Sequence, residues 1–398
     1  MQTRLTAAAL AALALAPLTA AQGTIVGRNR VAAASEASAR FDPCSPRPLT
    51  TPTYAFQVSA GSWQQCGFRA WPFSASFSPD GSDLFVPLFG GVIGNGGCTV
   101  ARVDPTTLQL RGQIQTGESP EEVAFVTRPD GSLLYGFISD SSASAVVVFD
   151  DLDQVVATIP LPPEPGGTFP TAFPYGVITA PDQRTVYVGT LDGQGFVYAI
   201  DVATLQIDAA RTIFLGAETG ASRMAFAGDQ LVIGGTTFFP NFTGSTARVF
   251  VVDPAVPQAP RSLVLASDSS GFLFPNPQDM AVACDGTVWL AGFDMGPRVY
   301  AIDPAGPTLI TTVPTGTSEP DGKFQALGLS PDGLLAVADF LTDEIGLIDV
   351  RRFAYRETIE LDLLPGNFRA AQEITFSPDG QRMLVPFAAS DNIAVFDL

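Results

Sequence analysis

Short apolar segments alternate with polar turns along almost the whole chain, and few of these segments are long enough to form a helix. In the last complete repeat, two of them flank Pro331-Asp332-Gly333, where proline presets φ and glycine accepts a positive φ. Short strands joined by tight turns are typical of an all-β protein. The pattern predicts four antiparallel strands in this repeat, at residues 327–330, 334–338, 345–349 and 358–363.

The same order of strands recurs seven times. Phe-Ser-Pro-Asp-Gly occurs at 77–81 and at 376–380, and weaker copies lie between, with turn aspartates 47 to 56 residues apart. These aspartates are Asp80, Asp130, Asp182, Asp229, Asp285, Asp332 and Asp379. The third strands are expected at residues 99–104, 145–150, 196–201, 248–253, 298–303, 344–349 and 392–397. Seven four-stranded repeats of this length predict a β-propeller.

The two ends of the repeat array complement each other. The last repeat stops after its third strand, whereas residues 54–59 form a strand-like segment ahead of the first repeat. This segment can supply the missing outer strand and remove an open sheet edge. We therefore predict a single seven-bladed β-propeller over residues 51–398, with four-stranded antiparallel blades and a ring closed by an N-terminal outer strand.

The first residues have the pattern of a secretory signal. Arg4 precedes an Ala/Leu-rich run from Leu5 to Leu18, and small residues follow before Gln22. The run is too short to span a bilayer, and later apolar stretches are interrupted by Asp, Gly or Pro. The prediction is a signal peptide at 1–21, a leader at 22–50, no transmembrane segment, and an exported protein that is periplasmic, on the cell surface or secreted.

Charge and composition narrow the range of functions. The 398 residues include 21 basic and 40 acidic ones, a net charge of −19, and Lys323 is the only lysine. An acidic surface repels phosphate backbones and anionic lipids, so nucleic acid is not an expected partner. The chain contains no histidine, which excludes a Ser-His-Asp or Cys-His nucleophilic site and a His-rich zinc site.

Four cysteines in an exported protein allow two disulfides in three pairings. Cys66 lies just before the inner strand of the first blade, and Cys98 follows the connection between its second and third strands. Both are expected on the same face of one blade, so we predict a Cys66–Cys98 disulfide. The sequence leaves the pairing of Cys44 and Cys284 open.

One repeat carries a family signature. Val186-Tyr187-Val188-Gly189-Thr190, followed by Tyr198-Ala199-Ile200-Asp201, resembles the YVTN repeat of lactonase-type seven-bladed propellers, over roughly residues 54–398. The resemblance implies the seven-bladed propeller fold. The family includes bacterial surface and periplasmic proteins, and its more distant relatives hydrolyse sugar lactones. Repeats three to five lack the full Ser-Pro-Asp-Gly turn, and Asn is absent from the signature at Thr190.

The start of each inner strand is expected at the mouth of the central channel. Counting back from each turn aspartate gives two successive positions per blade, here called the first and second mouth positions. The first holds Phe73, Glu121, Tyr175, Ser222, Gln278, Gln325 and Gln372. The second holds Ser74, Glu122, Gly176, Arg223, Asp279, Ala326 and Glu373. We predict ligand binding by Glu122, Tyr175, Arg223, Gln278, Asp279, Gln325, Gln372 and Glu373.

Two functions are compatible with this set. The first is a non-enzymatic binding protein, expected as a monomer, that presents the mouth and its loops to a small molecule or a protein. The second is a lactonase-like hydrolase that uses Glu122, Asp279 or Glu373, since burial can raise the pKa of a carboxyl group enough for general acid–base work. No cofactor is expected, although carboxylates at the mouth could hold a divalent cation.

Phenylalanines gather in the loops expected on the same face. Phe340 and Phe387 are expected to pack in the core between blades. Residues 238–242 and 272–275 lie in long loops, where an apolar patch often marks an interaction surface. Folding back over the rim of their own blades is the equally open alternative.

Overall fold

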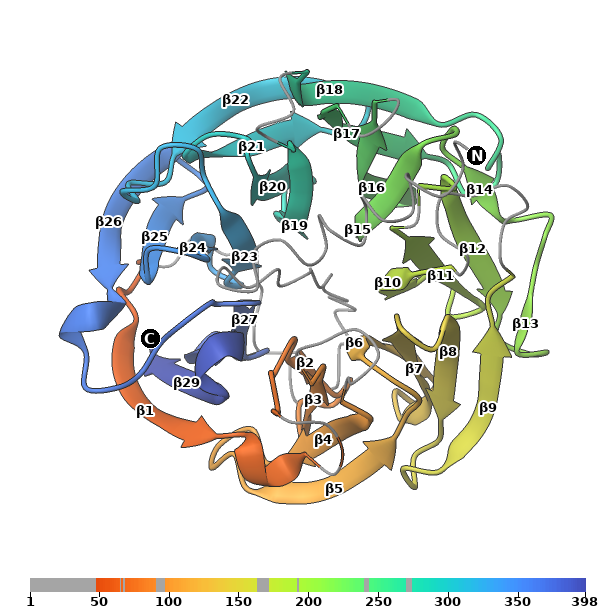
Figure 1. The fold of residues 1–398 in the computed structure, drawn as a ribbon, viewed down its shortest axis with the longest axis horizontal. Coiled ribbons are helices and arrows are strands. Elements are labelled where there is room, and N and C mark those ends of the chain that lie inside the picture. The colour runs from red at the N-terminus through yellow and green to blue at the C-terminus, as the bar shows by residue number, and fades with distance from the viewer. Residues whose placement is uncertain are drawn as a thin grey trace, which may run out of the picture.

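The computed structural model describes residues 48–64, 66, 69–90, 97–162, 172–191, 193–239, 243–269 and 274–398. Seven antiparallel sheets stand around a common centre like the blades of a propeller (Figure 1). Six of them are built from strands that follow one another in sequence, and the seventh joins the two ends of the array. The predicted seven-bladed β-propeller is confirmed.

The strands form four concentric layers, with one strand of each blade in each layer except that the outer layer of the third blade is split into two short strands (Figure 1). The inner strands are β2 (Ser76–Phe77), β6 (Pro120–Thr127), β10 (Pro174–Thr179), β15 (Thr219–Ala227), β19 (Asn276–Val282), β23 (Phe324–Leu329) and β27 (Thr375–Phe376). The second strands are β3 (Leu84–Leu88), β7 (Leu133–Asp140), β11 (Thr185–Thr190), β16 (Gln230–Phe238), β20 (Val288–Phe293), β24 (Leu334–Asp339) and β28 (Arg382–Phe387).

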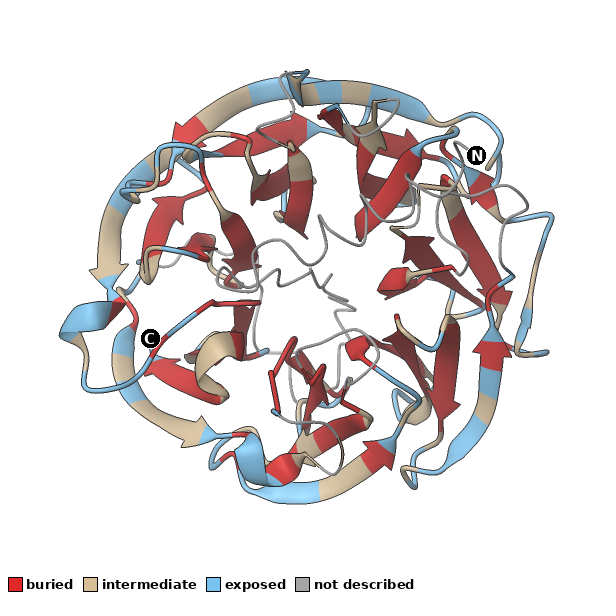
Figure 2. Cartoon of the chain, in the orientation of Figure 1, coloured by how far each residue is buried: buried red, intermediate tan, exposed pale blue. Residues whose placement is uncertain are grey.

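The outer half of each blade is more exposed. The third strands are β4 (Thr99–Val103), β8 (Ala145–Phe149), β12 (Phe196–Asp201), β17 (Ser245–Val252), β21 (Arg298–Asp303), β25 (Glu344–Asp349) and β29 (Asn392–Asp397). The outer strands are β5 (Leu110–Gln115), β9 (Val155–Pro160), β13 (Gln206–Ile207) with β14 (Ile213–Phe214), β18 (Arg261–Asp268), β22 (Thr308–Pro314), β26 (Ala354–Glu360) and β1 (Thr53–Ser59). Figure 2 shows burial falling from the inner strands to this outermost layer.

The ring is closed by β1. It pairs antiparallel with β29, and the register runs from Thr53 opposite Asp397 to Ser59 opposite Asn392. The last blade is therefore completed by a segment that precedes the first blade in sequence, as predicted. This pairing covers the edge that β29 would otherwise leave open.

One predicted strand is misplaced. The outer strand of the sixth blade is β26, not residues 358–363, and a short 3-10 helix occupies Leu361–Leu363. A tight turn after β25 sets Asp349 opposite Ala354, so pairing starts earlier than the apolar pattern suggests. Outer strands face solvent, which lets polar residues such as Arg356 and Glu357 fill the strand and weakens the apolar signal.

The hydrophobic core of the described residues forms eight clusters, and seven of them lie one between each pair of neighbouring blades. Between the last two blades, for example, Leu334 and Leu347 pack with Val385 and Phe396. Each blade is thus held by apolar contacts on both faces, and the stability of the ring depends on every interface.

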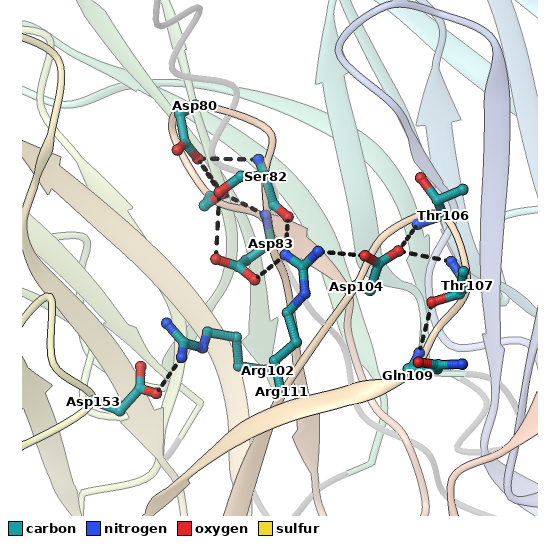
Figure 3. A network of polar contacts seen from close by, with 11 residues as sticks. Asp80, Ser82, Asp83, Arg102, Asp104, Thr106, Thr107, Gln109, Arg111 and Asp153 are labelled. Atoms are coloured by element: carbon teal, nitrogen blue, oxygen red, sulfur yellow. Dashed lines mark hydrogen bonds and ion pairs between the residues drawn. The ribbon is translucent and has the colours of Figure 1, made fainter.

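The recurrent turns satisfy their own polar groups. Asp80 accepts hydrogen bonds from the Ser78 hydroxyl (2.6 Å) and the Ser82 amide (3.0 Å), and Gly81 has φ of 73°. In Figure 3, Arg111 donates to Asp83 and Asp104 and ties two turns of the first blade together. These carboxylates are committed to the turn, which agrees with a structural role for the Ser-Pro-Asp-Gly repeat.

Candidate functional site at the channel mouth

Every inner strand is irregular at the mouth positions. In each blade, the inner strand has one residue more than the second strand over the mouth positions. In the fifth blade, for example, Pro277 pairs with Gly292 and Asp279 with Ala291, so two steps along the inner strand match one step along the second strand. The same extra residue occurs in all seven blades. In the first and the last blade it lies between an isolated β-bridge and the short inner strand. A β-bulge re-aims side chains that regular alternation would send to opposite faces. The two successive mouth residues can therefore act in one site.

The second mouth position contains three carboxylates that bind the next blade. The amide of Val177 donates to Glu122 (2.8 Å), that of Leu327 to Asp279 (2.8 Å), and that of Ala75 to Glu373 (3.2 Å). Each amide belongs to the residue just after the second mouth position of the neighbouring blade. These carboxylates join successive blades through their backbones.

The residue before each of these amides is small. Gly176 precedes Val177, Ala326 precedes Leu327, and Ser74 precedes Ala75. At Gly176 the fit against the next blade is tight, because an added Cβ would lie 2.5 Å from the Ser222 carbonyl oxygen. The glycine therefore lets the third and fourth blades approach closely.

Arg223 is the cation of this ring. It is fully buried, its Nε donates to the Gln278 carbonyl, and Asp279 Oδ1 lies 3.7 Å from that nitrogen. Its guanidinium carbon lies 5.9 Å from the centre of the Tyr175 ring, a cation–π arrangement. Both terminal nitrogens, Nη1 and Nη2, lack a hydrogen-bond partner among the described residues.

Unpaired polar atoms concentrate at the mouth. Besides the two Arg223 nitrogens, the buried atoms without a hydrogen-bond partner in the described part of the chain include both Glu121 carboxylate oxygens, Glu122 Oε1, the Tyr175 hydroxyl, Gln278 Oε1 and Gln325 Oε1. Buried polar groups in native proteins are nearly always paired with protein, water or ligand. The cluster therefore marks a place where a polar occupant is expected.

The charged mouth residues influence one another across the ring. Glu122 of the second blade feels the charges of Asp279 and Glu373, from the fifth and seventh blades. Arg223 of the fourth blade likewise feels Glu122 and Glu373. These blades are not neighbours in the ring, so these interactions run across the channel mouth (Figure 1).

Burial controls the ionisation of this cluster. It raises the pKa of the Glu121 and Glu122 carboxyl groups well above the ordinary value, and it raises the pKa of the Tyr175 hydroxyl. Burial also lowers the pKa of Arg223. Neutral carboxyl groups beside a guanidinium give the mouth both hydrogen-bond donors and acceptors.

A further buried carboxyl group lies behind Glu121. Asp140, at the end of β7, accepts hydrogen bonds from the amides of Gly117 (2.6 Å) and Glu118 (2.9 Å). Burial outweighs these bonds and raises the pKa of Asp140 to about 7. The neighbouring Ser141 hydroxyl donates to the Ser119 carbonyl at 3.2 Å.

The structure places all eight sequence-predicted residues in this ring, but in two groups. Glu122, Asp279 and Glu373 hold backbone amides, and the Gln325 amide donates to Gln372 (3.0 Å). Unpaired atoms instead come mostly from Tyr175, Arg223, Gln278, Gln325 and a residue outside the predicted set, Glu121. The signal for Glu121 is its place at the first mouth position, between Pro120 and Glu122.

The mouth face also carries the disulfide between Cys66 and Cys98, whose Cα atoms are 5.8 Å apart. Cys284 is disulfide-bonded as well, and Cys44 lies outside the described residues. Phe340 and Phe387 are buried, as expected, whereas Phe238 and Phe274 are half-buried. Phe242 and Phe272 lie outside the described residues.

Two kinds of feature are absent from the described ranges. No three acidic or cysteine side chains lie close enough together to share a metal ion. No helix there combines the length and apolar character needed to cross a bilayer.

Comparison with known proteins supports the fold class. No family model matches the chain, and no curated protein matches its sequence. Hydrazine synthase of Kuenenia stuttgartiensis is similar in structure, with a TM-score of 0.64 and 18% identity, over 83% of this chain and 96% of that one. The β-propeller domain of Cps50 (Swd1) from Myceliophteria thermophila gives a TM-score of 0.62 at 11% identity, over 87% and 100%. The class is the seven-bladed β-propeller.

Proposed function

We propose that this chain is a non-enzymatic binding protein whose channel mouth holds a small polar ligand. The observation that carries the proposal is the cluster of fully buried polar atoms at the mouth that have no protein partner. Leaving one such group unpaired costs about 1–3 kcal/mol. A ligand that offers both donors and acceptors would satisfy several of them at once.

The geometry does not favour the lactonase-like use of Glu122, Asp279 or Glu373. The three carboxylates assigned to lactonase-like chemistry each accept a backbone amide of the next blade. Kinship with YVTN-repeat lactonase-type propellers rests on the repeat signature alone, and we propose it as a relation of descent. Likeness of fold does not transfer an activity.

We also propose that the protein works outside the cytoplasm. Its N-terminal sequence has the pattern of an export signal, and its cysteines at 66 and 98 are joined. Disulfides persist in oxidising compartments. Fractionation of cells that produce the full chain tests this, with the protein expected in the periplasm, on the surface or in the medium. Recovery in the cytoplasm alone would contradict it.

Tyr175→Phe gives a clean test of ligand binding. The change removes a buried hydroxyl that has no protein partner, so the ligand-free protein should keep or gain stability. Native mass spectrometry of protein from its natural source should show a bound small molecule, and the variant should retain less of it. Arg352→Gln is the control, since that side chain is 83% exposed on the outer rim. Equal ligand content in all three, or none in any, would refute the proposal.

A further inference from the structure

Cys284 has a disulfide partner outside the pair already described. The chain has four cysteines. Cys66 and Cys98 are bonded to each other, and Cys284 is disulfide-bonded as well. Cys44 is the cysteine left to fill this place, and the predicted cleavage before Gln22 keeps it on the mature chain.

The position of Cys284 shows which part of the ring this bond must reach. Cys284 lies in the turn between β19 and β20 of the fifth blade, and it is exposed. The turns with Asp332 and Asp379 have the same place in the sixth and seventh blades. All three turns are on the face away from the channel mouth, so the partner of Cys284 must come from a segment on that face.

The chain ahead of β1 lies on this same face. Pro48 lines a pocket together with Asp332 and Asp379, the turn residues of the sixth and seventh blades. The carbonyl of Leu49 accepts a hydrogen bond from Arg356 of β26 (3.3 Å), and Leu49 packs against the core between these two blades. The segment that precedes the closing strand is therefore anchored at the sixth blade, the neighbour of the fifth.

Cys44 is close enough in sequence to bridge the remaining step. It lies four residues ahead of Pro48. An extended chain covers about 3.5 Å per residue, so four residues reach about 14 Å, and a disulfide joins Cα atoms about 5.5 Å apart. Packed sheets lie about 10 Å from each other, which is the step expected from the turn of one blade to that of the next. The reach of Cys44 exceeds that step.

We infer that Cys44 and Cys284 form a disulfide that ties residues 44–52, here called the strap, across the face away from the mouth. The two thiol sulfurs join, and their two protons and two electrons pass to a disulfide-bearing oxidant, which becomes two thiols. The first disulfide needs the same class of oxidant. The strap holds β1 at its Thr53 end, where the pairing with β29 begins. This inference goes beyond the proposed ligand binding and does not depend on it.

Peptide mapping of the full-length protein, purified without reductant and digested with pepsin at low pH, tests the bond. Low pH keeps thiols protonated and so prevents disulfide exchange. Mass spectrometry should find a pair of peptides that contain Cys44 and Cys284 and that separate on reduction. Cys284 found as a free thiol, capped by a small thiol, or joined to a second copy of the chain would overturn the inference.

The bond between Cys66 and Cys98 is the internal reference of the same experiment. If this bond is found without the second one, the strap is wrong while the proposed export keeps its support. If neither bond is found, the strap and the proposed export are both contradicted.

Two substitutions test what the strap does. Cys44→Ser and Cys284→Ser should each lower the melting temperature by about 5 °C or more, because a cross-link that closes a long loop restricts the unfolded chain. The double variant should melt at the same temperature as the single ones, since either change breaks the same bond. Ser45→Ala, next to Cys44 in sequence, is the matched control and should melt like the unaltered protein. Additive losses in the double variant would show that the two cysteines share no bond.

Discussion

At the residue scale, carboxylates at the mouth join each blade to the next by accepting a backbone amide. Glu122 accepts the Val177 amide, while Gly176 beside it faces the fourth blade, where an added Cβ would lie 2.5 Å from the Ser222 carbonyl oxygen. Asp279 of the fifth blade and Glu373 of the seventh accept amides of the next blade in the same way. The same three carboxylates therefore make the channel mouth polar and hold neighbouring blades at a fixed spacing.

Replacing Gly176 by alanine should destabilise the protein. The new Cβ would meet the Ser222 carbonyl oxygen at 2.5 Å, and backbone cannot move aside without separating the third and fourth blades. We expect a loss of about 1–3 kcal/mol in the free energy of unfolding. Denaturant unfolding measures it, with Gly131→Ala as a comparison for a glycine that has open space but a φ of 85°. Unchanged stability in Gly176→Ala would contradict the close approach.

The interblade role of Glu122 predicts a contrast between two substitutions. Glu122→Gln keeps an oxygen that can accept the Val177 amide and should be nearly neutral, since burial already favours the uncharged carboxyl. Glu122→Ala leaves that buried amide unpaired and should cost about 1–3 kcal/mol. Thermal unfolding of both variants checks the contrast. Equal stability of the two would show that the hydrogen bond contributes nothing.

At the element scale, the repeated bulge and the closing strand decide what the ring can do. The bulge turns two successive residues of each inner strand into one site, which regular alternation would prevent. The strand β1 has a different task, because it completes the last blade from the far end of the array. Tyr54 anchors it through edge-on contacts with Phe368 (5.5 Å) and Phe396 (5.9 Å).

Tyr54→Ala should loosen the closure of the ring. It removes both aromatic contacts and opens a space beside the last interblade cluster, for a loss of about 2–4 kcal/mol in the free energy of unfolding. Hydrogen exchange should rise first in β1 and β29. The control Tyr355→Ala removes a 41% exposed tyrosine of β26 and should cost much less. Similar losses in both variants would deny β1 its special role.

At the scale of the whole molecule, buried acids link stability to pH. The folded pKa of Asp140 is about 7, and burial raises the pKa of Glu121 and Glu122 in the same direction. The folded state therefore holds protons that the unfolded chain releases, and a net charge of −19 adds repulsion as the pH rises. Stability from these groups is present below their ordinary pKa values and is lost as pH rises through the folded ones.

Unfolding in urea should accordingly require more denaturant at pH 5 than at pH 8. Each such group contributes up to about 1.4 kcal/mol per pH unit between its unfolded and folded pKa. Asp140→Asn should be less stable at pH 5, because it loses acceptor capacity, and should show a flatter dependence on pH. Greater stability at pH 8 would contradict the assignment of neutral buried acids.

Much of this architecture could be predicted from the sequence. The turn sequence recurs in each repeat, so the turn aspartates predicted the positions of the blades. The last repeat lacks a fourth strand, and this predicted that the segment ahead of the first repeat completes the last blade. The bulge was not predicted, because it can be recognised only when the inner strand is compared with the strand that pairs with it. Prolines at 72, 120, 174 and 277 precede it in four blades and were its only local sign, since proline in a strand is typical of bulges.

The different roles of the two adjacent glutamates could not be predicted either. Glu121 and Glu122 are adjacent and chemically alike, yet only Glu122 finds an amide on the next blade. That difference depends on where the neighbouring blade places its backbone, 55 residues further along the chain. Composition and local pattern contain no information about such a distance.

The pairing of β1 with β29 also sets how the ring responds to force. Thr53 faces Asp397, so the chain leaves both strands at the same end of the ladder. Tension between those two points would load one pair of residues at a time, as in opening a zipper, and not the whole ladder in shear. A pull on both points would therefore open the last blade from that end of the ladder.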